Sequence, residues 1–318
     1  AAYQGIKAKH DTGMVAGWVN VHNIGLDLRY DHPDAARGKA QARQLLSSGV
    51  FAFAAWQAPL TEGDIVPLLE QNKMPLIGAY GVGAEYHSPY AYSFQSHHYG
   101  YEMGRFLAQE KDVKHPGAIF ISGNAAANTA QVKAITAGVK AGGKTIASGD
   151  IVQVDVTKAS YDDVVTQFKL GGVDGMLTII DQTAYNRLQQ ALDRQSYHPI
   201  HIADPLFTDP TVRQSATTEG TLVASDFEFL DNGKPAVEEY AAAVRKQFGS
   251  KAQISYLGVA GWFSAKVLVD AIGRMGDNIS RTNLIKVMDA LPPSTGDGFT
   301  APLTFQPGDH DVNQCLQL

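Results

Sequence analysis

The sequence predicts an α/β protein with two doubly wound, parallel-sheet lobes, and three observations support this. Its 318 residues exceed the length of about 250–300 residues at which a single hydrophobic core stops growing. Short apolar runs alternate with longer amphipathic segments, as in strand–helix–strand units. After residue 227 helical patterns predominate, which predicts that the chain returns to cover the first sheet. Such a return joins the lobes by several crossovers, which is the architecture of a hinge.

The predicted strands are short, apolar and bounded by turn residues, as buried parallel strands are. They are Gly25–Tyr30, Val50–Ala55, Leu76–Ala79, Ala118–Ser122, Gly175–Ile180, His198–Ala203 and Thr221–Ser225. The predicted helices carry apolar residues at spacings of three and four. They are Pro33–Ser48, Thr61–Asn72, Gln131–Ala141, Tyr161–Leu170, Thr183–Gln195, Ala236–Phe248, Tyr256–Arg274 and Thr282–Leu291.

Composition excludes several classes of protein. The chain is 44% hydrophobic and 18% charged, which is an ordinary soluble globular profile. A net charge of −6 argues against a nucleic-acid partner, which would need a concentrated basic patch. The longest apolar runs, such as Val50–Trp56 and Met176–Ile180, are far below the ~20 residues that span a bilayer. The one cysteine, Cys315, excludes an internal disulfide framework.

Catalytic and cofactor motifs are missing from the sequence. It has no G-x-S-x-G, no G-x-x-x-x-G-K-[ST] and no H-E-x-x-H. Gly78, Gly81 and Gly83 follow a predicted strand, but Tyr86 breaks the spacing of a dinucleotide-binding loop, so we expect them to form a tight turn. The pair His97–His98 is expected at a helix start. We therefore predict a protein that is not an enzyme, with no catalytic residue, no metal and no cofactor.

The candidate ligand-binding residues are identified by position. In open α/β sheets, ligands bind beyond the carboxyl ends of the strands, where backbone N–H groups are free. The residues that follow the predicted strands are Trp56, Gln57, Ala58, Pro59, Tyr80, Gly81, Val82, Asn124, Asn128, Asp181, Gln182, Asp204 and Phe207. Aromatic walls with a few amides and carboxylates suit a small organic ligand. The alternative is structural: Asn124, Asp181 and Asp204 are good helix N-caps, and Trp56 could pack on the core.

The order of these elements resembles type I periplasmic solute-binding proteins of ABC transporters, of the leucine/isoleucine/valine (branched-chain amino acid)-binding type. The segments that carry the resemblance are Leu28–Ala36, Ala42–Leu46 followed by Gly49–Phe53, Ile65–Glu70 followed by Met74–Gly78, Ala137–Gly143, Tyr256–Trp262, and Ala301–Phe305 followed by Gly308–His310. The resemblance covers nearly the whole chain.

The resemblance implies two Rossmann-like lobes that are joined by a three-segment hinge and close on a ligand. One lobe would comprise 1–115 and 227–306, and the other 116–226 and 307–318. Cys315 would then lie in the last strand of the second lobe and pack there. The family's first strand and secretion signal would lie upstream of Ala1. It also implies a small-molecule ligand, an ABC permease with its ATPase as partner, a monomer, and a periplasmic or extracellular location, free or lipid-anchored upstream of Ala1.

Departures from the family pattern bear on the ligand. Pro59 and Val82 stand where amino-acid-binding members carry a Ser and a Thr that grip the ligand, and a Tyr expected near 124–128 is absent. Proline lacks an N–H and valine lacks a hydroxyl, so an amino-acid zwitterion in the usual pose is not expected. Trp56, Tyr80 and Asp181 favour an amino-acid-like, aromatic or apolar ligand with one hydrogen-bonding or cationic end. A ligand-sensing domain of the same fold is the alternative function.

Overall fold

The computed structural model describes residues 35–318 except 58, 82–83, 97, 122–124, 211, 213–217, 297, 309, 311–312 and 314. The chain divides into two compact units. Unit 1 comprises residues 1–97 and 226–315, and unit 2 comprises residues 98–225 and 316–318, so the chain passes between them three times. The predicted strand Gly25–Tyr30 and the expected upstream start lie outside the described residues. The prediction of an α/β fold with parallel sheets is confirmed.

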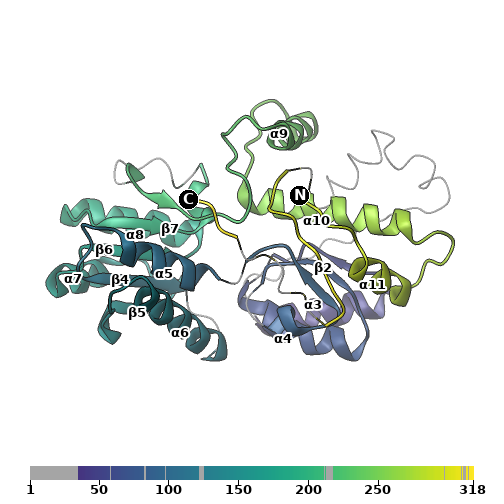
Figure 1. The fold of residues 1–318 in the computed structure, drawn as a ribbon, viewed down its shortest axis with the longest axis horizontal. Helices are drawn as coiled ribbons and strands as arrows, with labels where there is room; N and C mark the ends of the chain where they lie inside the picture. The colour runs from purple at the N-terminus through teal and green to yellow at the C-terminus, as the bar shows by residue number, and fades with distance from the viewer. Residues whose placement is uncertain are drawn as a thin grey trace. The chain divides into compact units, whose positions relative to one another are not determined.

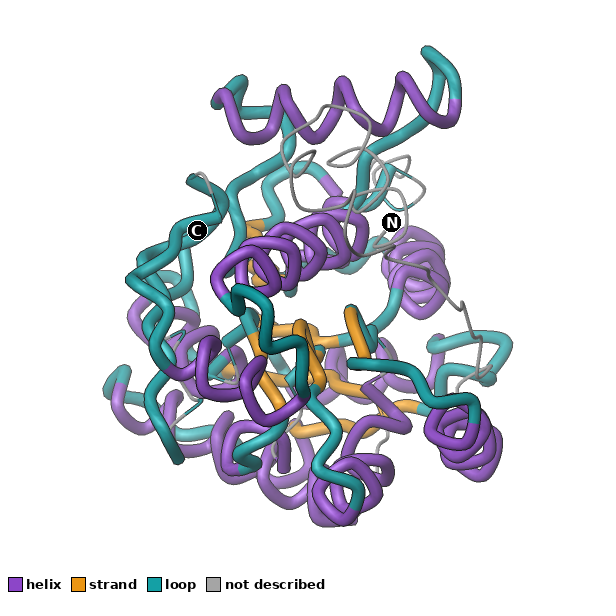
Figure 2. Tube along the Cα trace, turned by 90° about the vertical axis from the view of Figure 1, so that its right-hand side faces the viewer, coloured by secondary structure: helices purple, strands orange, loops and turns teal. Residues whose placement is uncertain are grey.

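Unit 1 is built on a parallel sheet of three strands in the order β1-β2-β3. Its elements are α3 (Ala35–Ser47), β1 (Phe53–Ala54), α4 (Pro59–Gln71), β2 (Leu76–Ala79), the 3₁₀ turn η1 (Ala84–His87), β3 (Ala91–Ser93), α9 (Pro235–Phe248), α10 (Tyr256–Arg274) and α11 (Arg281–Asp289). Figure 1 labels α3, α4, β2, α9, α10 and α11, and Figure 2 shows the short strands in orange among the helices.

Helices cover both faces of the unit 1 sheet. On one face, Ala42 of α3 and Ile65 of α4 pack with Leu76 in one buried cluster. On the other face lies α10, which approaches so closely that a Cβ added to Gly78 would lie 1.8 Å from Ser264 Oγ. Gly78 has a φ of +82° and lies within β2, as the predicted bounds Leu76–Ala79 require, and not in a turn after the strand. The prediction that the late helices return to the first sheet is confirmed for α10.

Unit 2 is a parallel sheet of five strands in the order β5-β4-β6-β7-β8. Its elements are α5 (Tyr99–Gln109), β4 (Pro116–Ile121), α6 (Ala125–Ala141), the 3₁₀ turn η2 (Ser148–Asp150), β5 (Ile151–Val154), α7 (Asp162–Gly171), β6 (Gly175–Ile179), α8 (Gln182–Gln195), β7 (Ile200–Ala203), the 3₁₀ turn η3 (Pro205–Thr208) and β8 (Leu222–Val223).

The side chains of unit 2 alternate between two helix-covered faces, as the period of two in a strand requires. Ala118 of β4 and Leu177 of β6 pack in one cluster with α5 and α6. Gly117 faces the other way, toward α7, and a Cβ added to it would lie 3.0 Å from the ring of Phe168. Figure 1 labels α5, α6 and α7 together with strands β4 to β7 of this sheet.

Two strands and one helix were not predicted from the sequence. Strand β3 has only three residues and follows Pro89, so no apolar run marks it. Strand β5 lies at the sheet edge with Gln153 exposed, and it lacks the continuous apolar pattern of a buried strand. Helix α5 buries two glycines, Gly100 and Gly104, which do not register in a hydrophobic pattern. Ala301–Phe305, one of the segments that carry the family resemblance, forms a single antiparallel bridge between Leu303 and Ser294.

The boundaries of the two units differ from the predicted lobe boundaries. Helix α5 belongs with unit 2, because Met103 and Leu107 are buried in the cluster that holds β4. Residues 307–315 belong with unit 1, because His310 Nδ1 lies 2.7 Å from the carbonyl oxygen of Ala91 and Asn313 Nδ2 donates to the carbonyl of Phe94 at 2.8 Å. Apolar burial and side-chain hydrogen bonds, which composition shifts do not report, therefore set both boundaries.

Cys315 is exposed and lies in unit 1, so the prediction that it packs in a strand of the second lobe is wrong. We expect this thiol to react with Ellman's reagent in the native protein, one equivalent per chain. We also expect Cys315→Ser to change the free energy of unfolding by less than about 0.5 kcal/mol, as surface substitutions usually do. A thiol that reacted only after urea was added would contradict this placement.

Candidate functional site

Three strand ends bring polar and aromatic residues to one edge of the unit 1 sheet. Trp56 and Gln57 follow β1, Tyr80 follows β2, and Gln95 follows β3. Because the strands are parallel and adjacent, their carboxyl ends meet at the same edge. The predicted residues Trp56, Gln57, Tyr80 and Gly81 are therefore brought together, as expected for a ligand-binding edge.

Trp56 is half-buried and is oriented by its neighbours. Its indole ring stacks on Phe53, with 5.8 Å between the ring centroids and 10° between the planes. Its Nε1 donates to Thr61 Oγ1 at 3.4 Å. The preceding residue, Ala55, has a φ of +53°, a left-handed conformation that a non-glycine residue rarely adopts and that concentrates at functional sites. One face of the Trp56 ring thus packs on the core, and its indole N–H already donates a hydrogen bond to Thr61.

Gln57 carries an acceptor that has no partner. Its Nε2 donates to the carbonyl oxygen of Gly78 at 3.2 Å. A carbonyl can only accept, so this contact fixes which end of the amide is nitrogen. The other end, Oε1, is buried and has no hydrogen-bond partner among the described residues.

Glu62 is a functional candidate that the sequence analysis missed. It lies in the first turn of α4 and is fully buried. One carboxylate oxygen accepts from the backbone N–H of Tyr80 at 2.7 Å, and the other accepts from that of Gly81 at 2.9 Å. The sequence does indicate that Glu62 is buried, because Glu62, Ile65 and Leu69 share one helix face at spacings of three and four. An acid on the apolar face of a predicted helix marks a buried charge.

A buried hydrogen-bonded chain continues from this edge to α10. Gln95 Nε2 donates to Tyr256 Oη at 2.9 Å, and Tyr256 donates to Asp226 Oδ1 at 2.6 Å. Asp226 Oδ2 accepts from the backbone N–H of Ser96 at 2.7 Å. Burial first, and then the negative charge of Asp226 and the nearby Tyr80, raise the pKa of Tyr256 well above its ordinary value. The Tyr256 hydroxyl therefore stays protonated and donates to Asp226. Gln95 Oε1 is buried without a partner in the described part of the chain.

At the corresponding edge of unit 2, Asn128, Asp181 and Gln182 are half-buried. Asn128 lies in the first turn of α6, which follows β4, and Gln182 is the first residue of α8, which follows β6. Asp181 caps α8, because its Oδ1 accepts from the backbone N–H of Ala184 at 2.7 Å. The alternative role predicted for Asp181, a helix N-cap, is confirmed.

Asp204 and Phe207 have packing roles in the structure. Asp204 is 3% exposed and caps the turn η3 by accepting from the backbone N–H of Leu206 at 2.9 Å. Its burial raises the pKa of the carboxyl well above the ordinary value. Phe207 is also 3% exposed, and its ring meets Tyr185 edge-on at 5.1 Å. Both side chains are thus turned into the core of unit 2.

Beside them lies a buried polar cluster that the sequence analysis missed. Thr178 Oγ1 donates to Tyr185 Oη at 3.1 Å, and Tyr185 donates back to the Thr178 carbonyl at 2.9 Å. Because the hydroxyl proton of Thr178 is already donated to Tyr185, His201 Nε2 must donate to Thr178 Oγ1, at 2.7 Å. His201 Nδ1 then accepts from Thr221 Oγ1 at 3.4 Å. Burial lowers the pKa of His201 to about 3, so the ring is neutral at pH 7.

Three predicted site residues, Ala58, Val82 and Asn124, lie outside the described residues, so their roles stay predictions. Pro59 is the first residue of α4, a position that suits proline because no backbone N–H is needed there. Across the described ranges, no group of three or more His, Cys, Asp or Glu side chains is arranged to hold a metal ion. The same ranges contain no helix long and apolar enough to cross a membrane.

Solved structures share this fold at low sequence identity. A possible leucine/isoleucine/valine-binding protein from Rhodopirellula baltica SH 1 has a TM-score of 0.83 at 17% identity, covering 99% of this chain and 87% of that one. A solute-binding protein of an ABC transporter from Rhodopseudomonas palustris BisB5, in complex with 3,4-dihydroxybenzoic acid, has a TM-score of 0.76 at 17% identity, with coverages of 97% and 87%. A branched-chain amino acid ABC transporter protein from Thermus thermophilus with bound valine has a TM-score of 0.75 at 14% identity, with coverages of 100% and 88%.

A search of curated proteins finds no match. The sequence model of one family, described as periplasmic binding protein, matches residues 5–318. This match spans both units and agrees with the two parallel sheets, the three crossings of the chain and the shared fold of the solved structures. The chain therefore belongs to the periplasmic binding protein family.

Proposed function

We propose that this protein is an extracytoplasmic solute-binding protein that captures a small organic ligand and delivers it to an ABC permease and its ATPase. The observation that carries the proposal is the unit 1 edge. There, the half-buried residues Trp56 and Tyr80 are joined by a hydrogen bond from the Tyr80 N–H to the Trp56 carbonyl at 3.1 Å, and the next residue after Trp56 is Gln57, whose Oε1 is buried without a partner in the described part of the chain. Aromatic surface with a few oriented polar atoms is typical of sites for small organic molecules.

The ligand class follows from the same residues. We propose a ligand with an aromatic or apolar body and one hydrogen-bonding or cationic end, for which the two rings supply contact area. Two related solved structures support an aromatic or apolar body, because one of them holds valine and another holds 3,4-dihydroxybenzoic acid. The protein is proposed to act as a monomer in the periplasm or outside the cell, and to bind its ligand without chemical change.

A thermal-shift screen over amino acids, amides, aromatic acids, amines and polyols tests this proposal. A ligand that binds only the folded state at 100 times its Kd stabilises it by about 2.7 kcal/mol, so we expect a saturable rise in Tm for at least one class. Chromatography of the recovered ligand should show it unchanged. A chemical product would indicate an enzyme, and a flat screen would indicate a structural or docking protein. Neighbouring genes for signalling proteins, in place of a permease and ATPase, would favour the sensor.

A further inference from the structure

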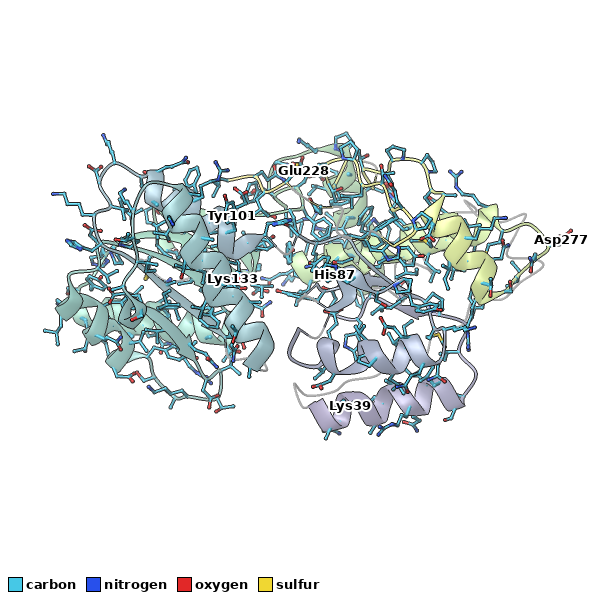
Figure 3. The ribbon with its side chains drawn as sticks, turned by 60° about the horizontal axis from the view of Figure 1, so that its bottom comes forward. Lys39, His87, Tyr101, Lys133, Glu228 and Asp277 are labelled. Atoms are coloured by element: carbon cyan, nitrogen blue, oxygen red, sulfur yellow. The ribbon has the colours of Figure 1, made fainter. Side chains whose placement is uncertain are left out.

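The polar atoms at the unit 1 edge are dominated by acceptors. We call this set the acceptor edge, and it consists of Trp56, Gln57, Glu62, Tyr80, Gln95 and Asp226. Two of its members are buried carboxylates, and two are amides with a buried, unpartnered oxygen. The two remaining members contribute half-buried aromatic rings. Figure 3 shows side chains of this unit together with those of unit 2.

The backbone donors of this edge are already taken. N–H groups beyond the carboxyl end of a parallel strand are the donors that an anionic ligand would use. Here Glu62 accepts from both Tyr80 and Gly81, with one N–H on each carboxylate oxygen. Such pairing stabilises the ionised carboxylate. A carboxylate ligand at this position could not accept from these two N–H groups, because both already donate to Glu62. It would also be repelled by the negative charge of Glu62.

The two amide oxygens need donors from outside the described residues. The contact of Gln57 Nε2 with the Gly78 carbonyl fixes the first amide. The second is fixed because Tyr256 gives its proton to Asp226, so its oxygen must accept from Gln95 Nε2. In both amides, the atom without a partner is therefore the oxygen, Oε1, which can only accept a hydrogen bond. A buried acceptor without a donor destabilises the protein. Gln95 is only 4% exposed, so bulk water does not readily satisfy it.

We propose that the acceptor edge binds the N–H-bearing cationic end of the ligand, a primary or secondary ammonium or a guanidinium group, and excludes a carboxylate. An N–H cation satisfies orphan amide oxygens, is attracted by the carboxylates of Glu62 and Asp226, and is favoured over the faces of Trp56 and Tyr80. The inference rests on the proposed function, because it assigns a charge class to the ligand of that site.

Matched ligands on the wild-type protein test the charge class by calorimetry. The pairs are phenethylamine against 3-phenylpropanoate, isoamylamine against 4-methylpentanoate, and agmatine against arginine. We expect the amine or guanidine of the best-binding pair to bind at least tenfold more tightly than its carboxylate-bearing partner. We expect N,N,N-trimethylphenethylammonium, which keeps the charge but has no N–H, to bind at least tenfold more weakly than phenethylamine.

Binding of the carboxylate-bearing member as tightly as the amine, or more tightly, would overturn the inference and leave the proposed function standing. An equal affinity for the trimethyl compound would overturn the assignment of Gln57 and Gln95 as acceptors of ligand N–H groups. If no organic molecule of any class binds in either this series or the thermal-shift screen, the proposed function fails and this inference fails with it.

Two variants test whether the acceptor edge is the source of this charge preference. Glu62→Gln removes the charge at nearly constant shape, and we expect the preference for the amine over the carboxylate to fall at least tenfold.

Gln57→Leu removes an amide oxygen that has no partner in the described part of the chain, and we expect the affinity for the amine to fall about fivefold with little change in the Tm of the unliganded protein. Gln167→Leu is the matched control, because Gln167 Nε2 also donates to a backbone carbonyl, that of Gly149, but lies exposed in unit 2. An equal loss of affinity for the amine in Gln57→Leu and Gln167→Leu would contradict the proposal.

Discussion

Replacing Gly138 with alanine is expected to destabilise unit 2 by at least about 2 kcal/mol, although alanine favours a helix over glycine by about 1 kcal/mol. Gly138 lies in α6, where α5 crosses it. A Cβ at this position would lie 1.9 Å from the carbonyl oxygen of Tyr101 and 2.7 Å from its carbonyl carbon. These are backbone atoms of a second helix, so no side chain can rotate away and the two helices must separate. Figure 3 labels Tyr101 and Lys133 on these two helices.

Gly273→Ala is the matched control for this substitution. Gly273 also lies inside a helix, α10, but an added Cβ would meet nothing within 4 Å. This variant should be stabilised by about 0.5–1 kcal/mol, because alanine loses less backbone entropy in a helix. Urea unfolding followed by circular dichroism measures both changes. Two variants with the same midpoint would show that α5 and α6 do not pack as closely as the structure places them.

Acidification from pH 7 to pH 4.5 is expected to destabilise the protein through His201 by up to about 2.7 kcal/mol, at about 1.36 kcal/mol for each unit of pKa separation. Burial lowers the pKa of His201 to about 3 from an ordinary value of 6.5. Between these values the unfolded chain binds a proton that the folded chain rejects. The stabilisation is therefore complete above about pH 6.5 and is lost progressively as the pH falls toward 3.

The comparison that isolates this effect is the slope of stability with pH in wild type and in His201→Gln. Carboxylates whose pKa values differ between the folded and unfolded states also contribute to acid lability, and both proteins keep them. The variant should therefore lose about 2 kcal/mol less than wild type between pH 7 and pH 4.5, whatever its stability at pH 7. If the variant does not fold, the wild-type His201 ring can be followed by NMR. A ring that titrated near pH 6.5 would contradict its burial.

The sequence predicted most helices and strands to within a few residues. Strand β2 and helix α10 have the predicted bounds, Leu76–Ala79 and Tyr256–Arg274, because each is a buried segment whose apolar pattern is local. Helix α5 was missed for the opposite reason. Its buried surface includes Gly100 and Gly104, where contact depends on the approach of α6.

The candidate site was predicted only in part. Trp56 and Tyr80 follow strands, so their position at the sheet edge could be inferred from strand order along the chain. Phe207 also follows a strand, yet it turns into the core, because Tyr185 and His201 offer it an aromatic neighbourhood. A residue's position after a strand does not determine whether its side chain faces the core or the edge.

The sequence by itself determined the fold class, the family and some of the residues at the sheet edges, because periodicity and element order are local properties of the chain. Only the tertiary structure decided the charge character of that edge. Glu62 accepts hydrogen bonds from residues 18 and 19 positions away, and Tyr256 donates to Asp226 across 30 positions. These contacts exist only once α4, α10 and the sheet have packed. They use the backbone N–H groups of Tyr80 and Gly81, whereas the Oε1 atoms of Gln57 and Gln95 have no donor in the described part of the chain, and this is the property that we propose selects the ligand.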